Sequence, residues 1–149
     1  MFSNIVLIAC FISWFIAQVA KVPLEYVRTG RWNWALIFSA GGMPSSHSAL
    51  VSSVAYGVGL SIGFDHPVFA LAFALAVIVI YDATGIRRQA GKHAAVINAI
   101  IEDLAAGHPL KEEQLREVLG HTPLQAIIGT ILGFLIMQLL WIFYPHRTF

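Results

Sequence analysis

Charged side chains are scarce in this sequence. Only 11% of its 149 residues are Asp, Glu, Lys or Arg, whereas 58% are hydrophobic. A soluble domain needs about 25% charged residues to cover its surface. The composition therefore excludes an ordinary soluble domain and predicts a membrane protein with a single domain, residues 1–149.

Two further scarcities exclude other classes of function. The single cysteine, Cys10, lies in an apolar run, so the chain has neither a disulfide framework nor a cysteine metal cluster. A net charge of +1 is too small to indicate nucleic acid as a partner. The histidine spacing is not typical of a metal site, and we expect no metal and no other cofactor.

Uncharged apolar runs predict about four membrane-spanning helices, and hence an all-α, polytopic membrane helical bundle. The runs are Phe2–Ala20, Ser48–Phe64, Val68–Tyr81 and Thr122–Tyr144. At a rise of about 1.5 Å per residue, the first and last can cross a hydrocarbon core of about 30 Å. The middle two are short for a full span, so tilt or local thinning of the bilayer has to accommodate them.

The positive charges lie almost entirely on one side of this arrangement. Of the nine cations, eight follow either the first or the third apolar run. These are Lys21, Arg28, Arg31, Arg87, Arg88, Lys92, Lys111 and Arg116. With four spans, both basic segments face the same compartment, and the positive-inside rule makes that compartment the cytoplasm. The predicted location is the cell membrane, multi-pass, with both termini outside.

Two connecting segments have special patterns. Residues 32–46 are uncharged but are interrupted by two glycines and a proline, which favours a re-entrant or interfacial segment over a continuous span. Ile86–Leu104 has apolar residues spaced alternately by four and three, which predicts an amphipathic helix on the cytoplasmic side.

The most specific motif is Gly-Gly-Met-Pro-Ser-Ser-His-Ser at residues 41–48. Two glycines allow the backbone to approach a ligand closely, and Ser45 or Ser46 can cap a helix that begins near His47. A helix N-terminus presents N–H groups and partial positive charge, which suits a phosphate. His47 would stand beside that phosphate as a proton donor.

Residues 44–47, Pro-Ser-Ser-His, resemble the second motif, Pro-Ser-Gly-His, of the type-2 phosphatidic acid phosphatase and vanadium haloperoxidase superfamily. Lys21, followed by six residues and then Arg28, is similar to the first motif of that superfamily, Lys-x6-Arg-Pro. Thr29 replaces the proline of that motif.

Residues 121–129 are similar to the end of the third motif, which reads His-x-Pro-x-Asp followed by an apolar stretch and a glycine. The whole chain, including Tyr-Asp-Ala-Thr-Gly-Ile-Arg-Arg at residues 81–88, most closely resembles the small divergent branch of the superfamily. This branch is described as related to acid phosphatases and vanadium-dependent haloperoxidases.

The resemblance implies a metal-independent phosphatase. In the superfamily, the third-motif histidine attacks phosphorus and the second-motif histidine protonates the leaving alcohol. These roles fall on His121 as nucleophile and His47 as general acid. Such a reaction needs positive charge around the phosphoryl oxygens. The implied phosphate-binding residues are Lys21, Arg28, Ser45, Ser46, Arg87 and Arg88.

The third motif departs from the superfamily pattern at two points. Gln125 replaces the aspartate that orients the nucleophilic imidazole, and no Ser-Arg pair stands five residues before His121. An amide oxygen can still accept from Nδ1–H, but it stabilises imidazolium poorly, which predicts a slower enzyme. Asp82 could supply the missing carboxylate.

Alternatives remain open for several of these residues. His93 follows Arg87 at the Arg-x5-His spacing and is an alternative nucleophile, although a polar-face histidine explains it as well. Arg87 and Arg88 could instead act as topogenic charges at anionic headgroups. Asp82 could equally form an ion pair with them.

The leading functional hypothesis is an integral membrane phosphatase that acts at the cytoplasmic face. Its expected partners are a phospholipid or polyprenyl phosphate substrate and the surrounding membrane lipids. The alternative is a non-catalytic lipid-phosphate-binding protein or subunit with an altered site, and a small transporter component is a third hypothesis. Because the superfamily core usually has six helices, a homodimer is one way to complete the site.

Overall fold

The computed structural model describes residues 4–39, 41–85, 93, 94, 96–98, 100, 101 and 122–143. Its elements are α1 (Ile5–Thr29), the 3-10 helix η1 (Trp34–Phe38), α2 (Ser46–Ile62), α3 (Pro67–Thr84) and α5 (Pro123–Phe143). Every element in these ranges is a helix, which confirms the predicted all-α class. Within the predicted amphipathic segment, the described residues from 93 to 101 are helical.

Local signals define the helix ends. The side chain of Asn4 accepts a hydrogen bond from Leu7 N at 3.0 Å and caps the start of α1. Gly30 ends α1 in the left-handed conformation, at φ +69°, and donates to Tyr26 O. His66 Nδ1 accepts from Val68 N at 3.2 Å at the start of α3.

Three of these helices are long and apolar enough to cross a membrane: α1, α3 and α5. Helix α2 has 17 residues, and its length of about 25 Å lies at the lower limit for a span. The structure thus supports a helical membrane bundle, while a fourth crossing and the re-entrant nature of residues 32–46 stay predictions.

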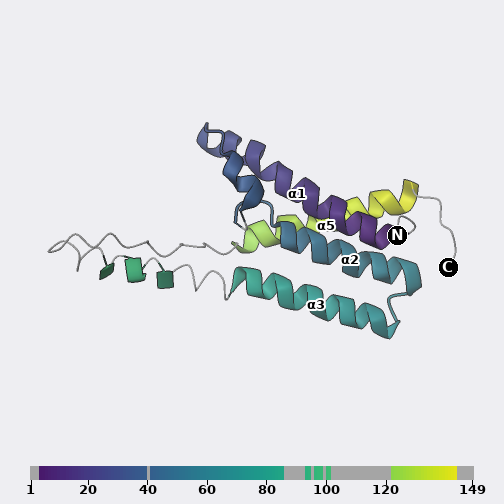
Figure 1. Cartoon of the computed structure of the whole chain (residues 1–149). Coiled ribbons are helices and arrows are strands. Elements are labelled where there is room, and N and C mark those ends of the chain that lie inside the picture. The colour runs from purple at the N-terminus through teal and green to yellow at the C-terminus, as the bar shows by residue number, and fades with distance from the viewer. Residues whose placement is uncertain are drawn as a thin grey trace.

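Helix α2 lies at the centre of the bundle, where it packs against α1, α3 and α5 (Figure 1). Two glycines of α5 make the contact with α2 close. A Cβ at Gly129 would overlap the Ser45 carbonyl oxygen, and a Cβ at Gly133 would overlap that of Ala49. Small residues at a helix interface allow this approach in a membrane, where packing drives association.

Two apolar clusters hold antiparallel pairs of helices together. One joins Ile5 and Ala9 of α1 to Met137 of α5, and the other joins α2 to α3 around Ala76. Consequently α1 and α3 run toward one end of the bundle, whereas α2 and α5 begin there (Figure 1). We call this end, where α3 ends and α2 and α5 begin, the Lys21 end.

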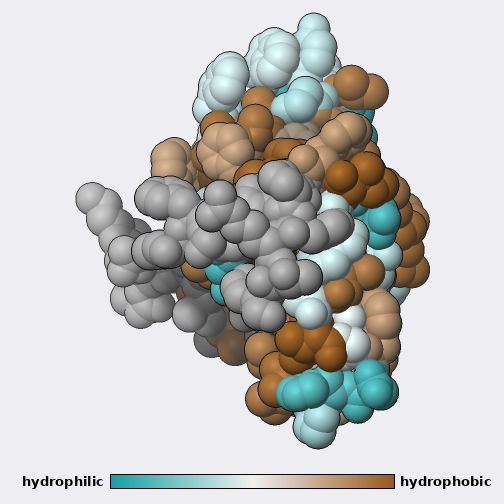
Figure 2. Space-filling model, turned by 90° about the vertical axis from the view of Figure 1, so that its right-hand side faces the viewer, coloured by the Kyte–Doolittle hydropathy of each residue, from teal (hydrophilic) through white to brown (hydrophobic). Residues whose placement is uncertain are grey.

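Large hydrophobic side chains cover much of the outside of the bundle. On α3, Leu71 is 72% exposed and Ile78 is 64% exposed. Figure 2 shows hydrophobic residues on the flanks of the molecule. Because lipid is as apolar as these side chains, such exposure suits a protein surrounded by hydrocarbon and would be unfavourable in water.

Candidate anion site at the Lys21 end

Lys21 is a buried lysine in the C-terminal half of α1, two turns before the helix ends. It is 1% exposed, and its Nζ donates a hydrogen bond to the carbonyl oxygen of Ser39 at 2.8 Å. Its methylene stem lies along Gly42, where a Cβ would be 3.5 Å from Lys21 Cδ. Gly42 also has φ +87°, a conformation that favours glycine. The glycine predicted to allow close approach therefore contacts the lysine of the first motif.

The ammonium of Lys21 has no carboxylate beside it among the described residues. Burying an ammonium is unfavourable unless hydrogen bonds and an opposite charge compensate it. An ammonium has three donors, and Ser39 O accepts one of them. Lys21 is thus suited to bind an anion through its remaining donors.

The loop that contacts Lys21 leads into the first turn of α2. Ser45 is the N-cap residue, because its Oγ accepts from Ser48 N at 3.2 Å. The Ser48 hydroxyl is also 3.0 Å from Ser45 Oγ. Ser45 and Ser46 are buried, and His47 is half-buried on the same turn. The N-terminus of α2 presents partial positive charge at the same end of the bundle as Lys21.

Helix α5 begins against the same turn. Ser45 N donates to the Gln125 carbonyl oxygen at 3.1 Å. Thr122 and Gln125 form a capping box, in which Thr122 N donates to Gln125 Oε1 at 3.0 Å and Gln125 N donates to Thr122 Oγ1 at 3.4 Å. The second motif and the end of the third motif thus lie side by side.

Four predicted site residues outside the third motif lie at the Lys21 end, and the side chains of two others are exposed. Lys21 contacts the loop at Ser39 and Gly42, and this loop leads into the turn with Ser45, Ser46 and His47, where the Gln125 backbone contacts Ser45. The Arg28 side chain is 74% exposed and forms a surface ion pair with Glu25 at 3.3 Å. His93 is exposed on its helical segment.

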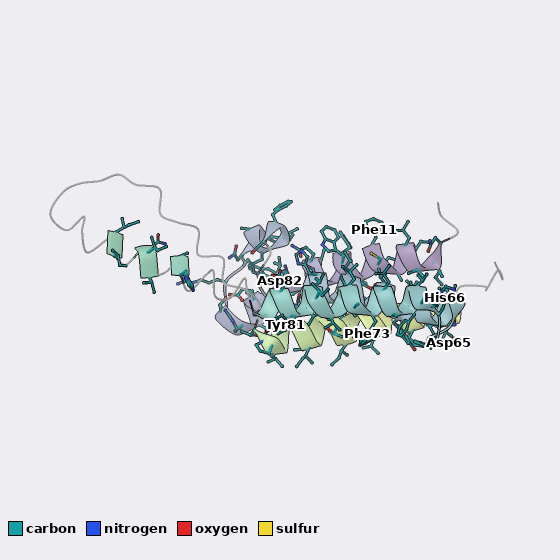
Figure 3. The ribbon with its side chains drawn as sticks, turned by 90° about the horizontal axis from the view of Figure 1, so that it is seen from below. Phe11, Asp65, His66, Phe73, Tyr81 and Asp82 are labelled. Carbon is teal, nitrogen blue, oxygen red and sulfur yellow. The ribbon has the colours of Figure 1, made fainter. Side chains whose placement is uncertain are left out.

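Asp82 is half-buried in the last turn of α3, which is also at the Lys21 end. Figure 3 shows Tyr81 and Asp82 at one end of α3 and the turn with Asp65 and His66 at the other. Three predicted residues, His121, Arg87 and Arg88, lie outside the described residues. Among those described, no three His, Cys, Asp or Glu side chains lie close enough to hold a metal ion.

Sequence reasoning missed Gln18 and the main chain of Ser39. Gln18 Nε2 lies within hydrogen-bond distance of the carbonyl oxygens of Leu36, Ile37 and Ser39. One feature of the sequence could have identified Gln18. It is a polar residue inside an apolar run, and it lies three positions before Lys21, on the same helix face.

Comparison with known proteins gives this geometry a family context. A family model described as the divergent PAP2 family matches residues 2–136. The chain belongs to the divergent PAP2 family. The match includes all three motif regions and confirms the resemblance inferred from them.

A curated relative also belongs in this comparison. The uncharacterized membrane protein YuiD of Bacillus subtilis (strain 168) is 37% identical over 153 residues, covering 95% of this chain and 97% of the relative. No solved structure matches the chain. This divergent PAP2 family member is therefore a membrane protein whose relative is itself uncharacterized.

Proposed function

We propose that this protein is an integral membrane phosphatase that hydrolyses a lipid phosphate monoester, or a polyprenyl phosphate or diphosphate. The observation that carries the proposal is the buried ammonium of Lys21, bonded to Ser39 in the loop that leads into α2. A buried cation without a carboxylate partner among the described residues, on a loop that leads into a helix N-terminus, suits a phosphate group. Family membership supports the same ligand.

The chemistry requires two histidines on opposite sides of phosphorus. In the proposed first step, a nitrogen of His121 attacks phosphorus, a P–N bond forms, and the bond to the alcohol oxygen breaks. His47 gives its proton to that oxygen. Water then attacks the phosphohistidine, gives a proton back to His47, and releases inorganic phosphate and free His121.

The arrangement of the helix starts supports this assignment. His47 lies in the first turn of α2, and His121 directly precedes Thr122, which caps α5. The hydrogen bond from Ser45 N to Gln125 O joins these two helix starts. Lys21 would stabilise charge on the equatorial oxygens as it develops.

We also propose that α2 is the fourth membrane crossing and that the Lys21 end faces the cytoplasm. Helix α2 runs antiparallel to α1 and α3 at the centre of the bundle (Figure 1). The C-terminal half of α1, together with the segments that follow α1 and α3, carries eight of the nine cations of the chain. Because these segments leave the same end of the bundle, the positive-inside rule supports a cytoplasmic site.

Phosphate release by purified protein in detergent tests the function. The substrates are phosphatidate, phosphatidylglycerophosphate, a polyprenyl phosphate and a polyprenyl diphosphate. We expect His47→Ala and His121→Ala each to lower kcat by at least about 100-fold. His93→Ala tests the alternative nucleophile, and His66→Ala, at the opposite end of α3, is the matched control. Wild-type activity in both of the first two variants would exclude the proposed mechanism.

One observation favours a second candidate, a non-catalytic lipid-phosphate-binding protein. Gln125 replaces the aspartate of the third motif, and its side-chain oxygen accepts from Thr122 N. This candidate predicts that the wild-type protein binds orthovanadate and releases no phosphate from any of the four substrates. Turnover that depends on His121 would exclude it.

A further inference from the structure

Gln18 holds the loop that contacts Lys21. It is 7% exposed and lies one turn before Lys21 on α1. Its Nε2 is 3.4 Å from Leu36 O and 3.0 Å from Ser39 O, and it also donates to Ile37 O. The two N–H donors of this buried amide thus face two carbonyl oxygens within η1 and that of Ser39, which follows η1.

The carbonyl oxygen of Ser39 is shared between Gln18 and Lys21. It accepts from Gln18 Nε2 at 3.0 Å and from Lys21 Nζ at 2.8 Å. Since a carbonyl oxygen has two lone pairs, it can accept both bonds. One carbonyl oxygen therefore links the amide of Gln18 to the ammonium of Lys21.

We propose that Gln18 is a positioning residue for the anion site, acting through the Ser39 carbonyl to fix the ammonium of Lys21. The inference rests on the proposed function, because the anion is taken to be phosphate. The amide suits this position because it donates without adding negative charge. A carboxylate at position 18 would repel the same carbonyl oxygens and would pair with the ammonium, leaving less positive charge for a ligand.

Anion binding by full-length protein in detergent tests this role. The measurement is the Kd of orthovanadate by titration calorimetry, repeated with inorganic phosphate, for Gln18→Leu and Gln18→Glu. The matched controls are Gln138→Leu and Gln138→Glu. Gln138 is a second intramembrane glutamine, which accepts from Tyr56 OH at 2.6 Å near the opposite end of the bundle. Lys21→Met serves as the reference for loss of the ammonium.

We expect Gln18→Leu to raise the Kd about tenfold, because a hydrogen-bonded anchor is lost. Gln18→Glu should raise it on the order of 100-fold, because the charge of Lys21 is also compensated. Neither Gln138 variant should change the Kd, although all four variants should unfold at lower temperature. In the phosphatase assay, Gln18→Leu should raise KM more than it lowers kcat.

Three outcomes separate this inference from the function on which it rests. If the Leu and Glu variants of Gln18 weaken vanadate binding equally, in proportion to their loss of thermal stability, the role is structural and the inference is wrong. If they bind like wild type while Lys21→Met does not, the inference also fails but the anion site stands. Wild-type binding by Lys21→Met would overturn the anion site itself. If Gln18→Leu does not fold, Gln18→Met takes its place.

Discussion

The backbone N–H of Ser45 donates a hydrogen bond to the backbone carbonyl oxygen of Gln125, with the two atoms 3.1 Å apart. This bond joins the N-cap of α2 to the first turn of α5 and so holds the second motif against the end of the third. Gly129 makes the contact possible, because a side chain there would overlap the Ser45 carbonyl oxygen. Activity should therefore depend on packing between α2 and α5 as well as on the histidines.

Replacing Gly129 by alanine tests this dependence. The new methyl group must displace the Ser45 backbone, which should destabilise the protein by about 1–3 kcal/mol and move the start of α2 away from α5. We expect a lower unfolding temperature and a lower kcat. Ile131→Ala on the same helix is the control, because Ile131 is 51% exposed at the lipid surface and its loss should affect both measurements little. A Gly129→Ala protein as active and as stable as wild type would contradict the packing described.

Ser45 has two roles that substitution can separate. Ser45→Ala removes the hydroxyl that accepts from Ser48 N, and loss of an N-cap costs about 1 kcal/mol of stability. Ser45→Asp keeps a capping acceptor but places negative charge beside the proposed phosphate. We expect the Ala variant to unfold at a lower temperature than the Asp variant, and the Asp variant to bind orthovanadate more weakly. Equal vanadate affinity in the two variants would argue against an anion at this turn.

The sequence was informative where chemistry depends on residue type at a fixed spacing. Lys21, His47 and the capping serine could be placed at one end of a helical bundle because motif and charge pattern agree. The sequence could not identify Gln18 as a hydrogen-bond donor to the loop. Its acceptors are main-chain carbonyl oxygens, which every residue type has. Likewise, the Lys-x6-Arg spacing places Arg28 two turns from Lys21 on one helix face. It does not indicate that the side chain is exposed and bonded to Glu25.

Removing the charge of Lys21 should change stability and function in opposite directions. Lys21→Met keeps the packed stem but removes the buried ammonium, whose burial disfavours the folded state because no carboxylate among the described residues compensates it. We expect the variant without ligand to unfold at the same or a higher temperature than wild type and to lose orthovanadate binding. Arg28→Met, at an exposed ion pair, should change stability by less than about 1 kcal/mol. A large loss of stability in Lys21→Met would show that the lysine is a structural requirement.

Labelling with a membrane-impermeant maleimide tests the orientation of the bundle. Cys10 is buried in α1, so the wild-type protein should give a low background. Cysteine is introduced either at Arg31, just beyond the end of α1, or at Asp65, in the exposed turn between α2 and α3 (Figure 3). If the Lys21 end faces the cytoplasm, intact cells should label the Asp65→Cys protein only, and lysed cells should label both. Labelling of Arg31→Cys alone in intact cells would invert the topology. Labelling of both would mean that α2 does not cross the membrane between these two positions.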